Sequence, residues 1–137
     1  MSTDKLKFFP LPLKGVYVGG GRWKLTAPFE YHSEKYGIIK VPSFLISDGA
    51  SIPKPFYSLI GGRWTGKYVE ASIIHDFLYF KQIYSRRKSD LIFLEAMKVL
   101  KVSRWKRKVM YYAVRGGAYF IWKRRVKHLK AKREATN

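Results

Sequence analysis

The sequence predicts an α+β domain in which a small antiparallel β-sheet or set of hairpins precedes three to four helices, the last long and basic. Two observations predict this class. The first 47 residues contain short segments rich in β-branched and aromatic residues and bounded by Gly or Pro, a pattern typical of strands. After Asp48, apolar residues recur at helical spacing. At 137 residues the chain has the size of a single domain, so we expect a β-rich part over 1–47, a helical part over 48–122 and a basic tail over 123–137.

Strands are predicted over residues 15–19, 22–26 and 36–41. The first two are expected to form a hairpin, because the three glycines at 19–21 tolerate the positive φ angles of a tight turn. A phosphate-binding loop is the alternative for these glycines. Such loops lead into the amino terminus of a helix, however, and the segment that follows here has the composition of a strand.

Helices are predicted in four segments. Ser51 and Pro53 favour a short helix ending near residue 60, and Thr65 is a candidate cap for a second helix over about 68–81. A third is expected from Ser85 or Arg87 to Val102. The fourth begins after Ser103 and is expected to continue through the Gly116–Gly117 pair as one long helix. Its apolar stripe is predicted to comprise Trp105, Val109, Ala113, Gly117 and Phe120 or Ile121.

Composition restricts the chemistry. The chain has no cysteine, which excludes disulfides, zinc ribbons and thiol nucleophiles. Residues 109–122 are the most membrane-like segment, but they are too few to cross a bilayer and contain Arg115. No amino-terminal signal peptide is recognisable, because the run after Lys5 is interrupted by Lys and Pro. We therefore expect a soluble protein, or one held in an assembly.

A polar group is predicted around His75 and Asp76, the most distinctive pair in the chain. On a helical wheel Ser72, His75, Asp76 and Tyr79 share one side of the second helix, flanked by apolar residues. Three roles are open. The group could be a structural hydrogen-bonded cluster that fixes the turn at Asp48. It could be a metal site formed by Asp48, His75, Asp76 and Asp90, whose ligand types suit a divalent transition metal. It could also be a metal-free catalytic site in which His75, oriented by Asp76, activates Ser51 or a water.

Four motifs in this region resemble a known family. They are Asp48-Gly-Ala-Ser-Ile-Pro53, His75-Asp-Phe-Leu-Tyr79, Arg87-x-x-Asp90-x-x-Phe93 and Met110-Tyr-Tyr-Ala-Val-Arg115. In order and spacing they resemble the phage and prophage family catalogued as domain of unknown function 1353, over roughly residues 15–122. The resemblance implies a viral context. It places the family's polar positions at Asp48, Ser51, His75, Asp76, Tyr79, Arg87, Asp90 and Arg115.

The tail beyond the resemblance is strongly basic. The net charge of the chain is +19, which favours an anionic partner. An acidic protein surface, nucleic acid or anionic lipid could be that partner, and a solvated charged helix end is the alternative. The cations that would contact a partner are Lys123, Arg124, Arg125, Lys127, Lys130, Lys132 and Arg133.

Three functions follow as hypotheses. The first is a virion structural protein of the tail or baseplate, made in the host cytoplasm, that docks on larger phage proteins or on copies of itself and requires no cofactor. The second is a metal-dependent hydrolase or nuclease that uses the His75 site. The third is a non-specific nucleic-acid-binding protein of the phage.

Overall fold

A computed structural model of the chain describes residues 3–47 and 68–136. Helix α1 (Thr3–Phe8) precedes the strands β1 (Gly15–Gly19), β2 (Arg22–Leu25), β3 (Phe29–Ser33), β4 (Gly37–Val41) and β5 (Ile46–Ser47). The helices α3 (Val69–Lys81), α4 (Arg86–Val99), α5 (Arg104–Gly117) and α6 (Tyr119–Thr136) follow. The predicted α+β class is therefore confirmed. The helix predicted to end near residue 60 lies outside the described residues.

Two small antiparallel sheets form the β-rich part. One has the strand order β1-β2-β5, and the other is the β3-β4 hairpin. The predicted hairpin of β1 and β2 is confirmed, and its turn places Gly19, Gly20 and Gly21 at φ angles of 87°, 62° and 75°. The sequence analysis did not predict three of the elements: α1, β3 and the two-residue β5. β3 nevertheless alternates in the manner of a strand with one buried face, since Phe29, Tyr31 and Ser33 are buried while the residues between them are half-buried.

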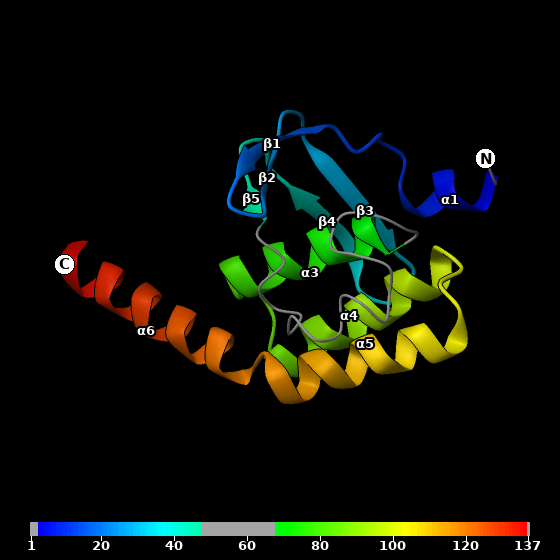
Figure 1. The fold of residues 1–137 in the computed structure, drawn as a ribbon. Helices are drawn as coiled ribbons and strands as arrows, with labels where there is room; N and C mark the ends of the chain where they lie inside the picture. Colours follow the sequence, from blue (N-terminus) through cyan, green and yellow to red (C-terminus); the bar gives the residue numbers. More distant parts are fainter. Residues whose placement is uncertain (1–2, 48–67, 137) are drawn as a thin grey trace.

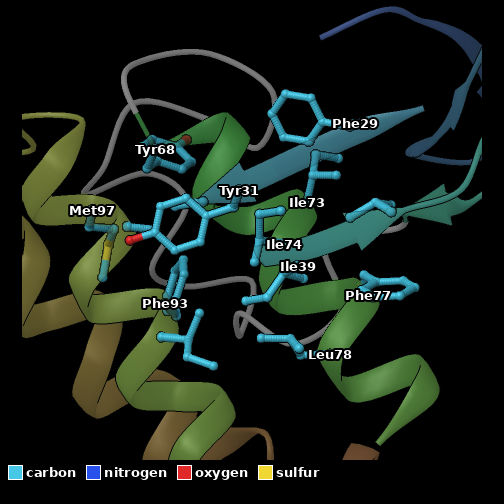
Figure 2. Close-up of a cluster of buried hydrophobic side chains, with 14 of the residues drawn as sticks. Phe29, Tyr31, Ile39, Tyr68, Ile73, Ile74, Phe77, Leu78, Phe93 and Met97 are labelled. Carbon is cyan, nitrogen blue, oxygen red and sulfur yellow. The ribbon is translucent and has the colours of Figure 1, made fainter. Parts of the chain in front are cut away.

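The elements form layers, as Figure 1 shows: α3 lies beneath the strands, and α4 and α5 lie beneath α3. The core lies between the β3-β4 hairpin and the helices α3 and α4. In Figure 2 the ring of Tyr31 from β3 reaches Phe93 of α4, beside Ile39 from β4 and Ile74 from α3. Each of these four side chains is almost completely buried, so the hairpin and the helices share one apolar core.

Helix boundaries follow from local chemistry. α4 begins where Ser85 Oγ accepts a hydrogen bond from the backbone N–H of Lys88, which satisfies a donor at the start of the helix. α3 ends at Gln82, which adopts a left-handed conformation (φ 53°) and donates its N–H to the carbonyl oxygen of Leu78. These two ends fix the short connection that turns the chain from α3 into α4.

The prediction of one long helix after Ser103 is wrong. The chain forms two helices that meet at Ala118, directly after the glycine pair. Apart from proline, glycine is the least favourable residue in a helix interior, so the glycine pair weakens the helix at this position. Ala118 is completely buried, so the junction between the two helices packs against the rest of the molecule. Within the described residues, no helix has the length and apolar composition that a bilayer crossing requires.

The predicted apolar stripe of this segment is also wrong in part. Trp105 and Phe120 are 53% and 73% exposed, and Gly117 is exposed as well. The buried face of α5 instead carries Met110, Ala113 and Val114. α6 has no buried residue and projects away from the rest of the molecule (Figure 1). The stripe ends near the start of α6, where Ile121, one of its predicted members, and Trp122 are half-buried and pack against the core.

Candidate functional site

A single buried carboxylate connects three helices. Asp90 of α4 is completely buried, and its Oδ1 lies 2.7 Å from His75 Nε2. The hydroxyl of Tyr79 donates a hydrogen bond of 2.7 Å to the same oxygen. Arg115 of α5 donates from Nη1 to the other oxygen, Oδ2, also at 2.7 Å. Both carboxylate oxygens therefore have charge-assisted or hydroxyl donors, as a buried carboxylate requires.

The helical geometry explains how these groups meet. His75 and Tyr79 are four residues apart, which places them one above the other on the face of α3 that packs against α4. The imidazole of His75 is also packed between rings, with centroids 4.3 Å from Tyr79 and 4.7 Å from Phe93. The site is thus held by hydrogen bonds and by aromatic packing together.

The electrostatics of Asp90 follow from this environment. Burial alone would raise the pKa of its carboxyl. The hydrogen bond and electrostatic interaction with His75, with the hydrogen bonds from Tyr79 and Arg115, outweigh burial and hold the pKa of Asp90 below its ordinary value of 3.8. Burial and the neighbouring Asp90 raise the pKa of Tyr79, so its hydroxyl remains protonated and donates. The site is an ionic cluster of a carboxylate and its donors at neutral pH.

Asp76 and His75 have different hydrogen-bond partners. Ser47 Oγ of β5 donates a hydrogen bond to Asp76 Oδ2. Successive residues of a helix point about 100° apart, so the two neighbours link α3 to different elements: His75 to α4, and Asp76 to the strands. The sequence prediction treated them as one pair and did not identify Ser47.

The structure brings together four of the predicted polar residues, namely His75, Tyr79, Asp90 and Arg115. Arg87, also predicted for this cluster, has an exposed side chain, because the turn of α4 directs it outward. The preceding residue, Arg86, points inward and donates from Nη2 to the carbonyl oxygens of Val114 and Arg115. Asp48 and Ser51 lie outside the described residues.

The metal hypothesis rested on Asp48, His75, Asp76 and Asp90. Among residues 3–47 and 68–136, no three His, Asp or Glu side chains are grouped so that they could hold a metal ion. Asp90 has both oxygens engaged by protein donors. As described, the cluster binds three helices to one another, and its groups are satisfied internally.

A second polar contact was not predicted. Glu95 of α4 accepts hydrogen bonds at Oε1 from the hydroxyls of Tyr31 and Ser33 on β3. Burial and Glu95 together raise the pKa of Tyr31. The period-two alternation of β3 could have located Tyr31 and Ser33 on the inner face, but their partner is more than 60 residues away and has no local signal.

The first half of α6 is attached to the end of α3. Gln82 Nε2 donates to the carbonyl oxygen of Trp122 at 3.1 Å, and the rings of Trp122 and Tyr79 meet edge to face with centroids 5.0 Å apart. Arg125 Nε donates to the carbonyl oxygen of Phe80 at 2.7 Å, and its guanidinium lies 3.8 Å from the centre of the Phe80 ring. Arg125, predicted to contact a partner, therefore contacts α3.

Comparison with known proteins identifies the family to which the chain belongs. The model of the family described as "Protein of unknown function (DUF1353)" matches residues 23–114. The chain belongs to the DUF1353 family. The matched region contains His75, Tyr79 and Asp90, stops one residue before Arg115 and leaves α6 outside.

Two relatives come from Sinorhizobium fredii (strain NBRC 101917 / NGR234). Uncharacterized protein y4jT is 46% identical over 94 residues, which cover 67% of this chain and 27% of the relative. Uncharacterized protein y4iH is 29% identical over 68 residues, covering 50% of this chain and 28% of the relative. The chain thus spans less than a third of these curated relatives. No solved structure matches it significantly.

Proposed function

We propose that this DUF1353 protein is a structural component of a bacteriophage particle, in the tail or baseplate region, that docks on a larger phage protein. The observation that carries the proposal is α6. This helix of 18 residues buries none of them and projects from the globular part (Figure 1). Only its first half is attached to α3, so residues 126–136 extend beyond the attachment, and an isolated helical stretch of this length is marginal in water, where most helices are stabilised by packing. A partner surface would supply that packing.

The docking surface is defined here as the exposed cations of α6 with the aromatic residues at its start. It comprises Lys123, Arg124, Lys127, Lys130, Lys132, Arg133, Tyr119 and Phe120. Aromatic side chains and Arg are enriched in protein interfaces, where they act as anchors. Cations steer and align an acidic partner without large desolvation at the rim. Trp105 and Tyr112 of α5, 53% and 68% exposed, add aromatic surface on the adjoining helix.

The buried cluster supports a scaffold role for the rest of the molecule. Asp90 holds α3, α4 and α5 together, and α6 is attached to α3 near Tyr79, a member of the same cluster. A docking helix is more useful on a rigid base, because less conformational freedom is lost on binding. This arrangement requires no chemistry at His75. The viral context comes from the family resemblance noted in the sequence.

Particle composition tests the proposal. In a phage that encodes the chain, mass spectrometry of purified particles is expected to find it at a fixed copy number per particle. Lys123, Arg124, Lys127 and Lys130 reversed together to Glu should lower that copy number severalfold. A matched variant reverses Arg22, Lys14, Lys35 and Lys40, exposed cations of the β-rich part, and should leave it unchanged.

Absence of the wild-type chain from particles, despite good expression during infection, would overturn the proposal. Equal losses from both quadruple variants would also contradict it, because general charge rather than α6 would then determine incorporation.

A further inference from the structure

A cleft lies between the end of α3 and the second half of α6. Its volume is about 450 Å³, and it opens to solvent. The residues that line it are Lys81, Gln82, Leu129, Lys132, Arg133 and Thr136. The contacts of Trp122 and Arg125 with α3 fix the nearer half of α6, so the cleft begins beyond them, where the two elements diverge.

The lining carries three positive charges and no acid. Lys81 comes from α3, whereas Lys132 and Arg133 come from α6, so the cations face a shared space from two elements. None of the three forms an ion pair within the described part of the chain. The two uncharged polar groups are engaged elsewhere, since Gln82 donates to Trp122 and Thr136 donates to the carbonyl oxygen of Arg133. The cations are therefore the groups available to a ligand.

Leu129 supplies an apolar surface within the cleft. It is half-buried, unlike its neighbours on α6, and the methylene stems of the surrounding Lys and Arg extend the apolar area. A ligand that satisfies the whole cleft therefore needs both negative charge and an apolar side chain.

From this combination we infer that the cleft between α3 and α6 binds an acidic segment of a partner protein that inserts an apolar side chain against Leu129. The inference rests on the proposed docking function and specifies the partner's chemistry. A nucleic acid would satisfy the cations, but its apolar surface lies on the bases, which stack on aromatic side chains, and the residues that line this cleft include none. A second copy of this chain is disfavoured, since two molecules of net charge +19 repel each other.

Fluorescence anisotropy on the full-length protein tests the inference with three labelled probes. They are a short peptide of repeated Glu-Glu-Leu units, the same peptide with Ser in place of Leu, and a single-stranded oligonucleotide of equal charge. The leucine peptide is expected to bind at least about threefold more tightly than the serine peptide, because burying the apolar side chain is favourable.

Two variants of equal charge change provide the control. Lys132→Glu with Arg133→Glu alters the cleft, and Lys35→Glu with Lys40→Glu alters exposed cations of the β-rich part, outside both the cleft and the docking surface. All four side chains are exposed, so both variants are expected to fold, as circular dichroism would verify. The cleft variant should weaken binding of the leucine peptide about tenfold or more, and the control variant less than about threefold.

Three results would overturn the inference. They are equal weakening by both variants, no preference for the leucine peptide, or tighter binding of the oligonucleotide than of either peptide. Incorporation into particles distinguishes this inference from the proposed function. If a cleft variant enters particles normally, the cleft has no part in docking, but the proposed structural role is unaffected. Absence of the wild-type chain from particles removes the role itself.

Discussion

Charged side chains serve opposite purposes in two regions of this molecule. Around Asp90, every oxygen of a buried carboxylate is bonded to a donor from α3 or α5. Along α6, Lys and Arg residues lie in solvent on a helix with no buried residue. Removing a charge from the first region leaves a buried partner unsatisfied and lowers stability. Removing a charge from the second region has little effect on stability, because the side chain is already in water. Burial, rather than charge itself, separates residues that stabilise the fold from residues available to a partner.

The largest expected effect comes from Asp90→Ala. The change leaves His75, Tyr79 and Arg115 without their common acceptor, and the free energy of unfolding should fall by about 3–5 kcal/mol. Urea denaturation followed by circular dichroism measures it. Glu34→Ala removes a carboxylate from an exposed ion pair with Lys7 and should cost less than about 0.5 kcal/mol. Similar losses for the two variants would show that Asp90 does not hold the helices together.

Acid should weaken the same region. Because the folded protein holds the pKa of Asp90 below 3.8, the stability that this carboxylate contributes is present above the unfolded value and is lost as the pH falls through the folded value. We therefore expect the unfolding free energy to decline below a pH of about 4. Asp90→Asn should show a shallower decline over that range, and parallel pH profiles for the two proteins would contradict the role assigned to this carboxyl.

A smaller effect is expected from Tyr79→Phe, which removes one of the donors to Asp90 and keeps the ring. The cost should be about 1.5–3 kcal/mol, as for a hydrogen bond to a charged group. The matched change is Tyr112→Phe on α5, where the side chain is 68% exposed and the stability should not change measurably. Thermal melts of both variants give the comparison, which fails if Tyr112 proves the more costly position.

The smallest effect on stability is expected in α6. Lys127→Glu with Lys130→Glu should alter the unfolding free energy by no more than about 0.5 kcal/mol, because neither residue is buried and surface changes are usually this small. The same urea titration measures it. A loss comparable with that of Tyr79→Phe would mean that α6 stabilises the globular part, contrary to the division between the two regions.

The sequence predicted those parts of the fold that have local signals. The glycines at 19–21 located the β1-β2 hairpin, and the four-residue spacing of apolar residues located α3. β5 has only two residues, too few for any periodicity. The division of the last helical segment at Ala118 depends on packing against the rest of the molecule, which the glycine pair could suggest but could not determine.

The sequence predicted which residues form the candidate site better than it predicted which of them contact one another. The family motifs pointed to His75, Tyr79, Asp90 and Arg115, which the structure brings together. Which acid meets His75 depends on how α3 packs against α4, and adjacency in sequence favoured Asp76 over Asp90. The choice between Arg86 and Arg87 depends on the rotation of α4 within a single turn, which exceeds the precision of a predicted helix start.

The attachment of α6 has a mechanical consequence. The helix is fixed at Trp122 and Arg125 and extends from there to Thr136, a free length of about 16 Å at 1.5 Å per residue. A load applied at its tip acts as a torque on the fixed end, where Trp122 rests against Tyr79. The fixed end of α6 is therefore one hydrogen bond from Asp90, and the buried cluster that joins α3, α4 and α5 is where such a force would be resisted.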